Sequence, residues 1–188
     1  MAKLVEDVYG NALFELAVEQ NRVDEYYEEA TGILEILRAH PELTRICTHP
    51  QIVKEEKLQT IDAVFKGRVA DETLGLMRMV IEKNHFANME DIFAFFADRV
   101  KAHKNIGVAF ISTPSELSAT QKAAVEKRLL DTTEYVSFEM HYEVEPELIG
   151  GMVIRIGDRV VDSSIRTKLE HLSRELSRIQ LKVGESTP

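Results

Sequence analysis

The chain has 188 residues, of which 44% are hydrophobic and 29% are charged, and its formal net charge at pH 7 is −9. This length and composition fit one medium or two small soluble domains. The negative charge argues against nucleic acid as a partner and against adsorption to anionic lipid, because both favour clustered Lys and Arg. No apolar run approaches the roughly 20 residues of a membrane helix, and no signal peptide is evident. We therefore expect a soluble cytosolic protein without direct membrane insertion.

The first 105 residues show apolar side chains at three- and four-residue spacing, which is typical of the buried face of a helix. The pattern predicts two long helices, a short third one, and three more of intermediate length. They correspond to residues 5–18, 23–37, 43–47, 58–65, 74–81 and 89–100. Gly67 is placed to cap the fourth helix. Short joints between these segments predict a compact antiparallel six-helix bundle over residues 1–105.

A strand-type pattern replaces the helical one after residue 105. Residues 108–112 are apolar on both sides, as expected of an interior strand. Ser118 and Gln121 have the spacing of a capping box and predict a helix that ends near residue 130. Residues 136–144 then alternate between apolar and polar side chains, which predicts a half-buried strand with one face in water.

Two further strands and a helix complete the predicted C-terminal region. A strand over 152–156, a Gly157–Asp158 turn and a return strand from Val160 predict a β-hairpin. The last helix is predicted from apolar residues spaced by four and three, which form a heptad seam. These residues are Ile165, Leu169, Leu172, Leu176 and Ile179. The predicted fold class is α+β, with the helical bundle followed by a small mixed α/β domain over residues 106–188.

The sequence contains no recognisable catalytic or ligand-binding motif. The glycines at 150, 151 and 157 do not have the spacing of a phosphate or dinucleotide loop, so Gly150 and Gly151 are interpreted as sites of positive φ or close backbone approach. The six histidines lack zinc spacing. Cys47 is the only cysteine, which excludes an intramolecular disulfide. We therefore expect no catalytic residue, no metal and no cofactor.

Two apolar surfaces are larger than a self-contained fold requires. The first helix has an unusually broad apolar face, and the last helix carries the heptad seam. Each could be ordinary core packing, or each could bind an amphipathic partner helix through anchors at i, i+3, i+4 and i+7. An acidic cluster on the second helix, from Asp24 to Glu29, is interpreted as a solvated face or as a surface that steers a basic partner.

The order of residues in one block resembles the delta subunit of bacterial F-type ATP synthases, a family that includes the mitochondrial oligomycin-sensitivity-conferring protein. The block is Leu148-Ile-Gly-Gly-Met-Val-Ile-Arg-Ile-Gly-Asp-Arg-Val-Val-Asp162, followed by Ser164-Ile-Arg and Leu169. Its signature residues are Gly150, Gly151, Gly157, Asp162 and Ser164. Weaker matches are Tyr9-Gly-Asn-Ala-Leu-Phe-Glu-Leu-Ala17 and Thr113-Pro-Ser-Glu-Leu-Ser118. The resemblance extends from about residue 5 to residue 180.

The resemblance implies a non-catalytic stator subunit on the cytoplasmic face of the bacterial cell membrane, within the whole ATP synthase complex. In that family the helical bundle binds the N-terminal helix of an alpha subunit in a groove between its first and fifth helices. The positions that correspond to this groove are Tyr9, Ala12, Leu13 and Leu16, with Leu76, Met77, Val80 and Ile81 opposite. The C-terminal domain would bind the b subunits of the peripheral stalk through the heptad seam, from Ile165 to Ile179.

The sequence departs from the family pattern at a few positions. Ser163 and Glu145 stand where the family usually has glycine and aspartate. Asn84-His85-Phe86 replaces an Asn-Gly pair that is often followed by Arg. Two other classes of function stay open at this point. One is a scaffold or adaptor that binds amphipathic helices of unrelated partners, and the other, more distant, is an enzyme.

Overall fold

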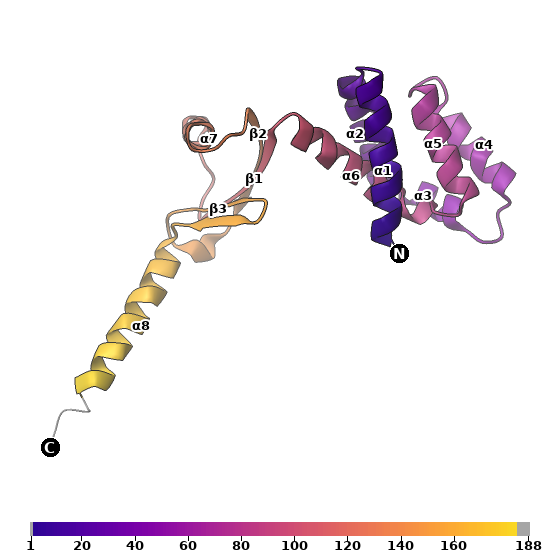
Figure 1. Cartoon of the computed structure of the whole chain (residues 1–188). Coiled ribbons are helices and arrows are strands. Elements are labelled where there is room, and N and C mark those ends of the chain that lie inside the picture. The colour runs from indigo at the N-terminus through magenta and orange to yellow at the C-terminus, as the bar shows by residue number, and fades with distance from the viewer. Residues whose placement is uncertain (1, 184–188) are drawn as a thin grey trace. The chain divides into compact units, whose positions relative to one another are not determined.

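The computed structural model describes residues 2–183, and the side chains of residues 4–177. The chain divides into two compact units, one up to His103 and one from Lys104 onward. Figure 1 shows the order of their elements along the chain. The N-terminal unit consists of α1 (Ala2–Glu19), α2 (Val23–Ala39), α3 (Pro41–Thr48), α4 (Lys54–Phe65), α5 (Asp71–Glu82), the 3₁₀ helix η1 (Phe86–Asn88) and α6 (Met89–His103).

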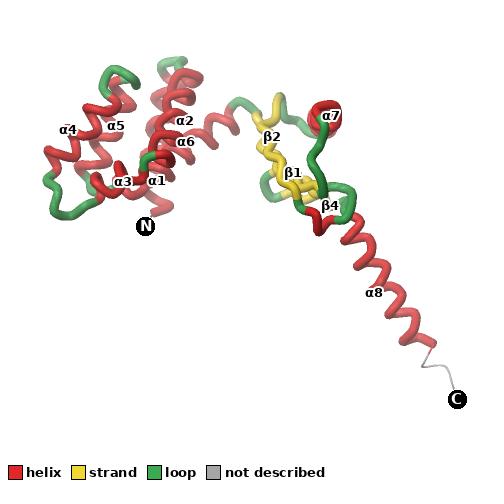
Figure 2. Tube along the Cα trace, turned by 180° about the vertical axis from the view of Figure 1, so that it is seen from behind, coloured by secondary structure: helices red, strands yellow, loops and turns green. Residues whose placement is uncertain are grey.

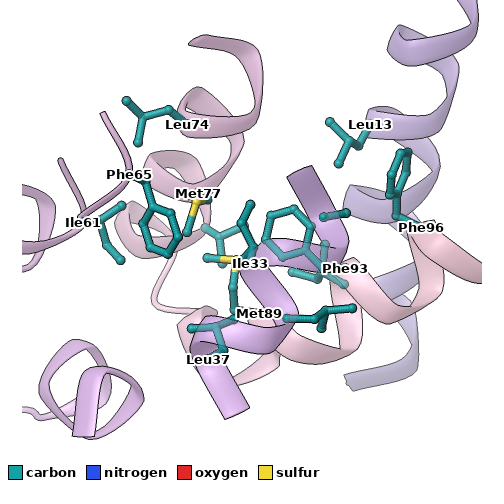
Figure 3. Packing of buried hydrophobic residues seen from close by; sticks show 14 of the residues in the cluster. Leu13, Ile33, Leu37, Ile61, Phe65, Leu74, Met77, Met89, Phe93 and Phe96 are labelled. Atoms are coloured by element: carbon teal, nitrogen blue, oxygen red, sulfur yellow. The ribbon is translucent and has the colours of Figure 1, made fainter. Parts of the chain in front are cut away.

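The core of the N-terminal unit forms around α6, which packs against both α1 and α2. Ile92 and Phe93 come four and three residues before Phe96, so both lie on the same side of the helix as Phe96. All three side chains are fully buried. Figure 3 shows how residues from several helices meet in this cluster. The C-cap of α4 is Lys66 rather than the predicted Gly67. Gly67, with φ +76°, is the third residue of the turn that follows, which the Arg68 N–H closes onto the Phe65 carbonyl at 2.9 Å.

A side chain of α2 holds the start of α5. Glu29 accepts hydrogen bonds from the backbone N–H of Ala70 at 2.8 Å and from the Thr73 hydroxyl at 2.7 Å. Ala70 is the N-cap of α5 and has no side chain that could bond the free N–H groups of the first turn. Within the acidic cluster of α2, Glu29 is therefore a capping residue, and the interpretation of that cluster as a purely solvated face was wrong at this position.

The C-terminal unit combines a four-stranded sheet with two helices. Its elements are β1 (Ile106–Thr113), α7 (Ala119–Thr132), β2 (Ser137–Val144), the 3₁₀ helix η2 (Pro146–Leu148), β3 (Val153–Ile156), β4 (Arg159–Asp162) and α8 (Ile165–Val183). Figure 2 colours helices and strands differently and shows the change from one unit to the other. Residues 2–183 thus contain eight α-helices and one mixed sheet, and the fold class is α+β as predicted.

The sheet has the strand order β2-β1-β3-β4. β1 pairs with β2 in parallel and with β3 antiparallel, so the predicted interior strand is confirmed. β3 and β4 form the predicted antiparallel hairpin, whose last pair is Ile156 with Arg159. The parallel pairing of β1 with β2 follows from the α7 crossover, because a parallel connection needs about a dozen residues or more.

Only one face of the sheet is covered by α7. The Ser118–Gln121 capping box that begins α7 is present as predicted. Leu129 of α7 packs against Ala109 and Ile111, which are fully buried, whereas Phe110 on the other face of β1 is 44% exposed. Apolar residues on both sides of this strand therefore do not mean two buried faces.

Candidate partner-binding surfaces

Two of the three glycines of the signature block, Gly151 and Gly157, have a positive φ. Gly157 in the hairpin turn has φ +55°. Gly151 has φ +77°, and a Cβ atom there would lie 2.4 Å from the carbonyl oxygen of Ser163. At Gly150 a Cβ atom would lie 2.5 Å from Cδ1 of Ile165, and the Gly150 carbonyl accepts a 2.9 Å hydrogen bond from the Ile165 N–H. The glycine pair therefore lets the turn after η2 pack against the first residues of α8, as the sequence predicted.

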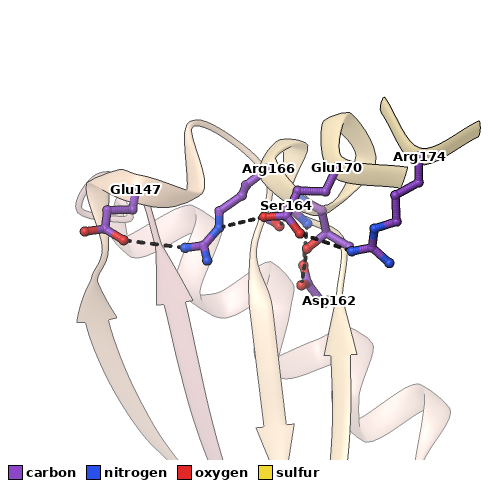
Figure 4. A network of polar contacts seen from close by, with 7 residues as sticks. Glu147, Asp162, Ser164, Arg166, Glu170 and Arg174 are labelled. Carbon is purple, nitrogen blue, oxygen red and sulfur yellow. Dashed lines mark hydrogen bonds and ion pairs between the residues drawn. The ribbon is translucent and has the colours of Figure 1, made fainter. Parts of the chain in front are cut away.

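Asp162 and Ser164 together begin α8. The buried Ser164 is its N-cap, and the Ser164 hydroxyl accepts a 3.2 Å hydrogen bond from the Thr167 N–H. Asp162 accepts from the Thr167 hydroxyl at 2.7 Å and from the Ser164 N–H at 2.8 Å (Figure 4). These bonds, with the one from Thr167 first, lower the pKa of the Asp162 carboxyl. The signature block thus fixes the direction in which α8 leaves the sheet.

Two details of this block were not predictable from its resemblance. Ser163, where the family usually has glycine, does not have a positive φ, and its hydroxyl donates to the carbonyl of Met152 at 2.8 Å. Ile149 does have a positive φ, +66°, and the Gly150 N–H donates to the Leu148 carbonyl across it. This tight three-residue turn is strained for a β-branched side chain. The Ile149 side chain is 64% exposed.

The apolar stripe of α8 is exposed to solvent. Ile165, Leu169 and Leu172 are 42%, 52% and 52% exposed, and Leu176 is 60% exposed. The Ile179 side chain lies outside the described residues. The main contact of α8 within its unit is with η2, near its first turn. The side chains of Leu169, Leu172 and Leu176 are thus more than half exposed, whereas Ile165 lies partly against Gly150.

In the N-terminal unit, α1 and α5 lie side by side and antiparallel. Gln20 at the end of α1 donates a 3.2 Å hydrogen bond to Glu72 in the first turn of α5. At the other end, the rings of Tyr9 and His85 are 6.5 Å apart. Phe86, which stands where the family often has Arg, is buried in the core. The two helices are thus joined at both ends, with apolar residues between the joints.

Burial divides the eight predicted groove residues into two groups. Leu13, Met77, Val80 and Ile81 are buried to 2% exposure or less and belong to the core of the unit. Tyr9, Leu16 and Leu76 are half-buried, and Ala12 is exposed. The spacing of apolar residues could not separate the two groups, because it defines a stripe but not which part of the stripe neighbouring helices cover.

Two further exposed apolar residues lie next to the exposed and half-buried groove positions and were not among the eight groove residues predicted from the sequence. Val8, four residues before Ala12, is 58% exposed, and Met79, three residues after Leu76, is 51% exposed. Leu76 and Met79 share the face of α5 that carries Glu72, the partner of α1. We call this surface the α1–α5 face. It consists of Val8, Tyr9, Ala12, Leu16, Leu76 and Met79.

The described residues hold no cluster of His, Cys, Asp or Glu with the geometry of a metal site. Among the same residues, no helix has the length and apolarity to cross a membrane. Cys47 is buried, and desolvation raises the pKa of its thiol to about 11, so the side chain is a structural rather than a reactive thiol. The described residues do include exposed apolar side chains on helices of both units.

The chain is therefore an α+β protein with exposed apolar side chains on helices of both units. Residues 5–176 match the family model described as ATP synthase delta (OSCP) subunit. The chain is 44% identical to ATP synthase subunit delta of Lachnoclostridium phytofermentans, over 96% of this chain and 100% of that protein. It is 30% identical to ATP synthase subunit delta of a Synechococcus species, over 94% and 97% of the two chains. The chain belongs to the ATP synthase delta (OSCP) subunit family.

A solved structure supports the same fold. A chain of the Toxoplasma gondii mitochondrial ATP synthase hexamer aligns with a TM-score of 0.68, over 91% of this chain and 96% of that one. The two sequences are only 18% identical, so this likeness concerns the fold alone.

Proposed function

We propose that this protein is the non-catalytic stator subunit that joins the catalytic head of an F-type ATP synthase to its peripheral stalk, at the cytoplasmic face of a bacterial membrane. Residues 1–105, as an antiparallel six-helix bundle, bind the N-terminal helix of an alpha subunit. Residues 106–188 bind the b subunits. The observation that carries this proposal is that each unit presents its own exposed apolar helix surface, the α1–α5 face and the α8 stripe.

The α1–α5 face has the chemistry of a groove for an amphipathic helix. Its apolar residues are flanked by the exposed carboxylates of Glu15 and Glu19 on α1 and of Glu82 on α5. A partner helix with an apolar stripe and basic flanks matches this pattern. The apolar residues would supply most of the affinity, because an exposed ion pair contributes only about 0–1 kcal/mol.

The α8 stripe has the chemistry of one strand of a coiled coil. Its leucines and isoleucines repeat in heptads. The helix from residue 165 to residue 183 carries five Lys or Arg and two Glu. A stalk helix with apolar a and d positions and acidic flanks is the complementary partner. An adaptor for unrelated helices would use the same faces, but no observation favours it over the family's own complex.

A mechanical anchor needs two surfaces that act at the same time. A rotor that turns inside the head exerts torque on it, so the head stays still only if it is tied to the membrane sector. Each tenfold gain in affinity requires about 1.4 kcal/mol, which buried apolar anchors on each unit can supply.

Calorimetry with two separate partners tests this function. A synthetic peptide of the alpha N-terminus and the soluble part of the b subunit should each bind the full chain. Val8→Glu should weaken peptide binding at least tenfold and leave b unchanged, while Leu172→Glu should do the reverse. Asn11→Glu and Ser173→Glu introduce the same side chain beside the two faces and serve as matched controls. Failure of the wild-type chain to bind either partner would exclude the stator role.

A further inference from the structure

On the face of the sheet that carries α7, the helix covers β1 and β2 but leaves β3 and β4 uncovered. α7 packs over β1 and β2 through Leu129, against Ala109 and Phe138. On β3 and β4, Ile154 and Ile156 are only half-buried, and Val161 is 62% exposed. The register places Ile111, Ile154 and Val161 in one row on the same face, so the row passes from under α7 into solvent.

A groove lies along this uncovered half. It has a volume of about 520 Å³ and is bounded by Ala124, Val125 and Arg128 of α7 on one side and by Ile154, Ile156 and Val161 of the hairpin on the other. A second cavity of about 520 Å³ shares Thr132, Thr133, Ile156 and Arg159 with the first, so the depression continues beyond the first cavity at that end. An elongated partner fits a depression that continues in this way better than a compact ligand does.

The width of the sheet indicates what kind of partner fits. Four strands about 4.8 Å apart make a sheet roughly 19 Å wide. One helix, about 10 Å in diameter, covers two strands of it. A second helix beside α7 would complete the layer over β3 and β4, in the usual two-layer arrangement of helices on a sheet.

The charges at the groove indicate the character of this helix. Arg128 and Arg159 both line the groove, and neither guanidinium group has a hydrogen bond or ion pair within the described part of the chain. By contrast, Arg155 on the opposite face stacks on Phe110. Unpaired guanidinium groups beside an apolar floor favour a helix with carboxylates next to its apolar stripe.

The same charges disfavour the chain's own α8 as the occupant. α8 has an exposed apolar stripe, but its charged residues are mainly basic, including Arg166, Lys168 and Arg174. Placing this helix in the groove would bring like charges toward Arg128 and Arg159. A second copy of the chain would offer the same basic helix.

We infer that the groove between α7 and the β3–β4 hairpin binds a second helical segment of the stalk, one with an apolar stripe and acidic flanks, separately from the α8 stripe. This inference rests on the proposed function, because it takes the partner to be the b subunits. The C-terminal unit would then hold the stalk at two places, one on the sheet and one on α8.

Val160 and Val161 provide a matched pair for the test. They are adjacent on β4, they are 60% and 62% exposed, and they point to opposite faces of the sheet. Calorimetry on the full chain with the soluble part of the b subunit should show at least tenfold weaker binding for Val161→Glu. Val160→Glu should bind within about twofold of the wild type. Since both side chains are exposed, neither variant should change the unfolding midpoint.

Charge reversal gives an independent second arm. Arg128→Glu combined with Arg159→Glu should weaken b binding at least tenfold and reduce its dependence on salt. Lys127→Glu changes the same type of charge on α7 at a residue that does not line the groove, and it should bind like the wild type.

The outcomes separate this inference from the proposed function. If b binds Val161→Glu and the Arg128→Glu/Arg159→Glu double variant as tightly as the wild type and the two control variants, the groove is not a stalk site. The stator role would then still stand. If Leu172→Glu alone abolishes binding and Val161→Glu has no effect, α8 is the whole stalk site. If b does not bind the wild-type chain, both proposals fail. Tenfold weakening by Val161→Glu with an unaffected Val160→Glu supports the groove.

Discussion

The Glu29 carboxylate of α2 accepts a 2.7 Å hydrogen bond from the hydroxyl of Thr73, a residue of α5 that is 1% exposed. The same carboxylate caps the first turn of α5 through the Ala70 N–H. One side chain therefore fixes the end of α5 that also bonds to α1 through Glu72. The position of the α1–α5 face depends on this contact.

Glu29→Ala should destabilise the N-terminal unit by about 1–2 kcal/mol, because it removes a cap and leaves the buried Thr73 hydroxyl without an acceptor. Urea denaturation of the full chain measures this change. Glu28→Ala removes an exposed carboxylate of the same helix and should cost less than about 0.5 kcal/mol. Equal stability of the two variants would show that Glu29 has no capping role.

The core residues of α1 should differ from the exposed residues of the same helix. Leu13 is 2% exposed, and Leu13→Ala should cost about 3 kcal/mol through lost burial and a cavity. Val8→Ala, at 58% exposure, should cost less than about 0.5 kcal/mol and act instead on binding of the alpha peptide. The same denaturation experiment distinguishes them. A small effect of Leu13→Ala on stability would return that residue to the partner surface.

Asp162 should make the start of α8 sensitive to acid. Its pKa in the folded protein is lowered by the bonds from Thr167 and Ser164, so its contribution to stability is complete above the unfolded-chain value of about 4. The contribution is lost as the pH falls through the lower folded value. The stability difference between the wild type and Asp162→Asn should therefore shrink from pH 6 to pH 2. NMR signals of the C-terminal unit, followed through thermal unfolding, measure it, and a difference independent of pH would contradict this assignment.

Cys47 should report opening of the N-terminal unit. Because burial raises its pKa to about 11, only about one thiol in ten thousand is ionised at pH 7. Labelling with a thiol reagent should be slow in the native protein and fast in denaturant. Glu29→Ala should accelerate native labelling, since it destabilises the unit around Cys47. Native labelling at the rate of an exposed cysteine would show that the thiol is accessible.

Local signals in the sequence predicted much of the fold. The Ser118–Gln121 capping box and the Gly157 turn depend on residues close together in the chain, so their spacing alone predicts them. The order of residues from Leu148 to Asp162 indicated the family, and the family model includes this block.

Contacts between distant residues could not be predicted in this way. Ala70 and Glu29 are 41 positions apart, and nothing in the spacing of α2 distinguishes Glu29 from its acidic neighbours. For the same reason, the sequence could not show that four of the eight predicted groove residues are buried in the core. Val80 and Met79 are adjacent on one amphipathic helix, but only the packing of α5 shows that Val80 is buried and Met79 is exposed.

The central claim is that one chain connects two partners at the same time, and a bridging capture tests it most directly. The soluble part of the b subunit is immobilised, and capture of a labelled alpha N-terminal peptide is measured with and without this chain. Capture should require the wild-type chain and should be lost with Val8→Glu and, separately, with Leu172→Glu. Capture that persists with both variants, or that never occurs with the wild-type chain, would contradict the stator account.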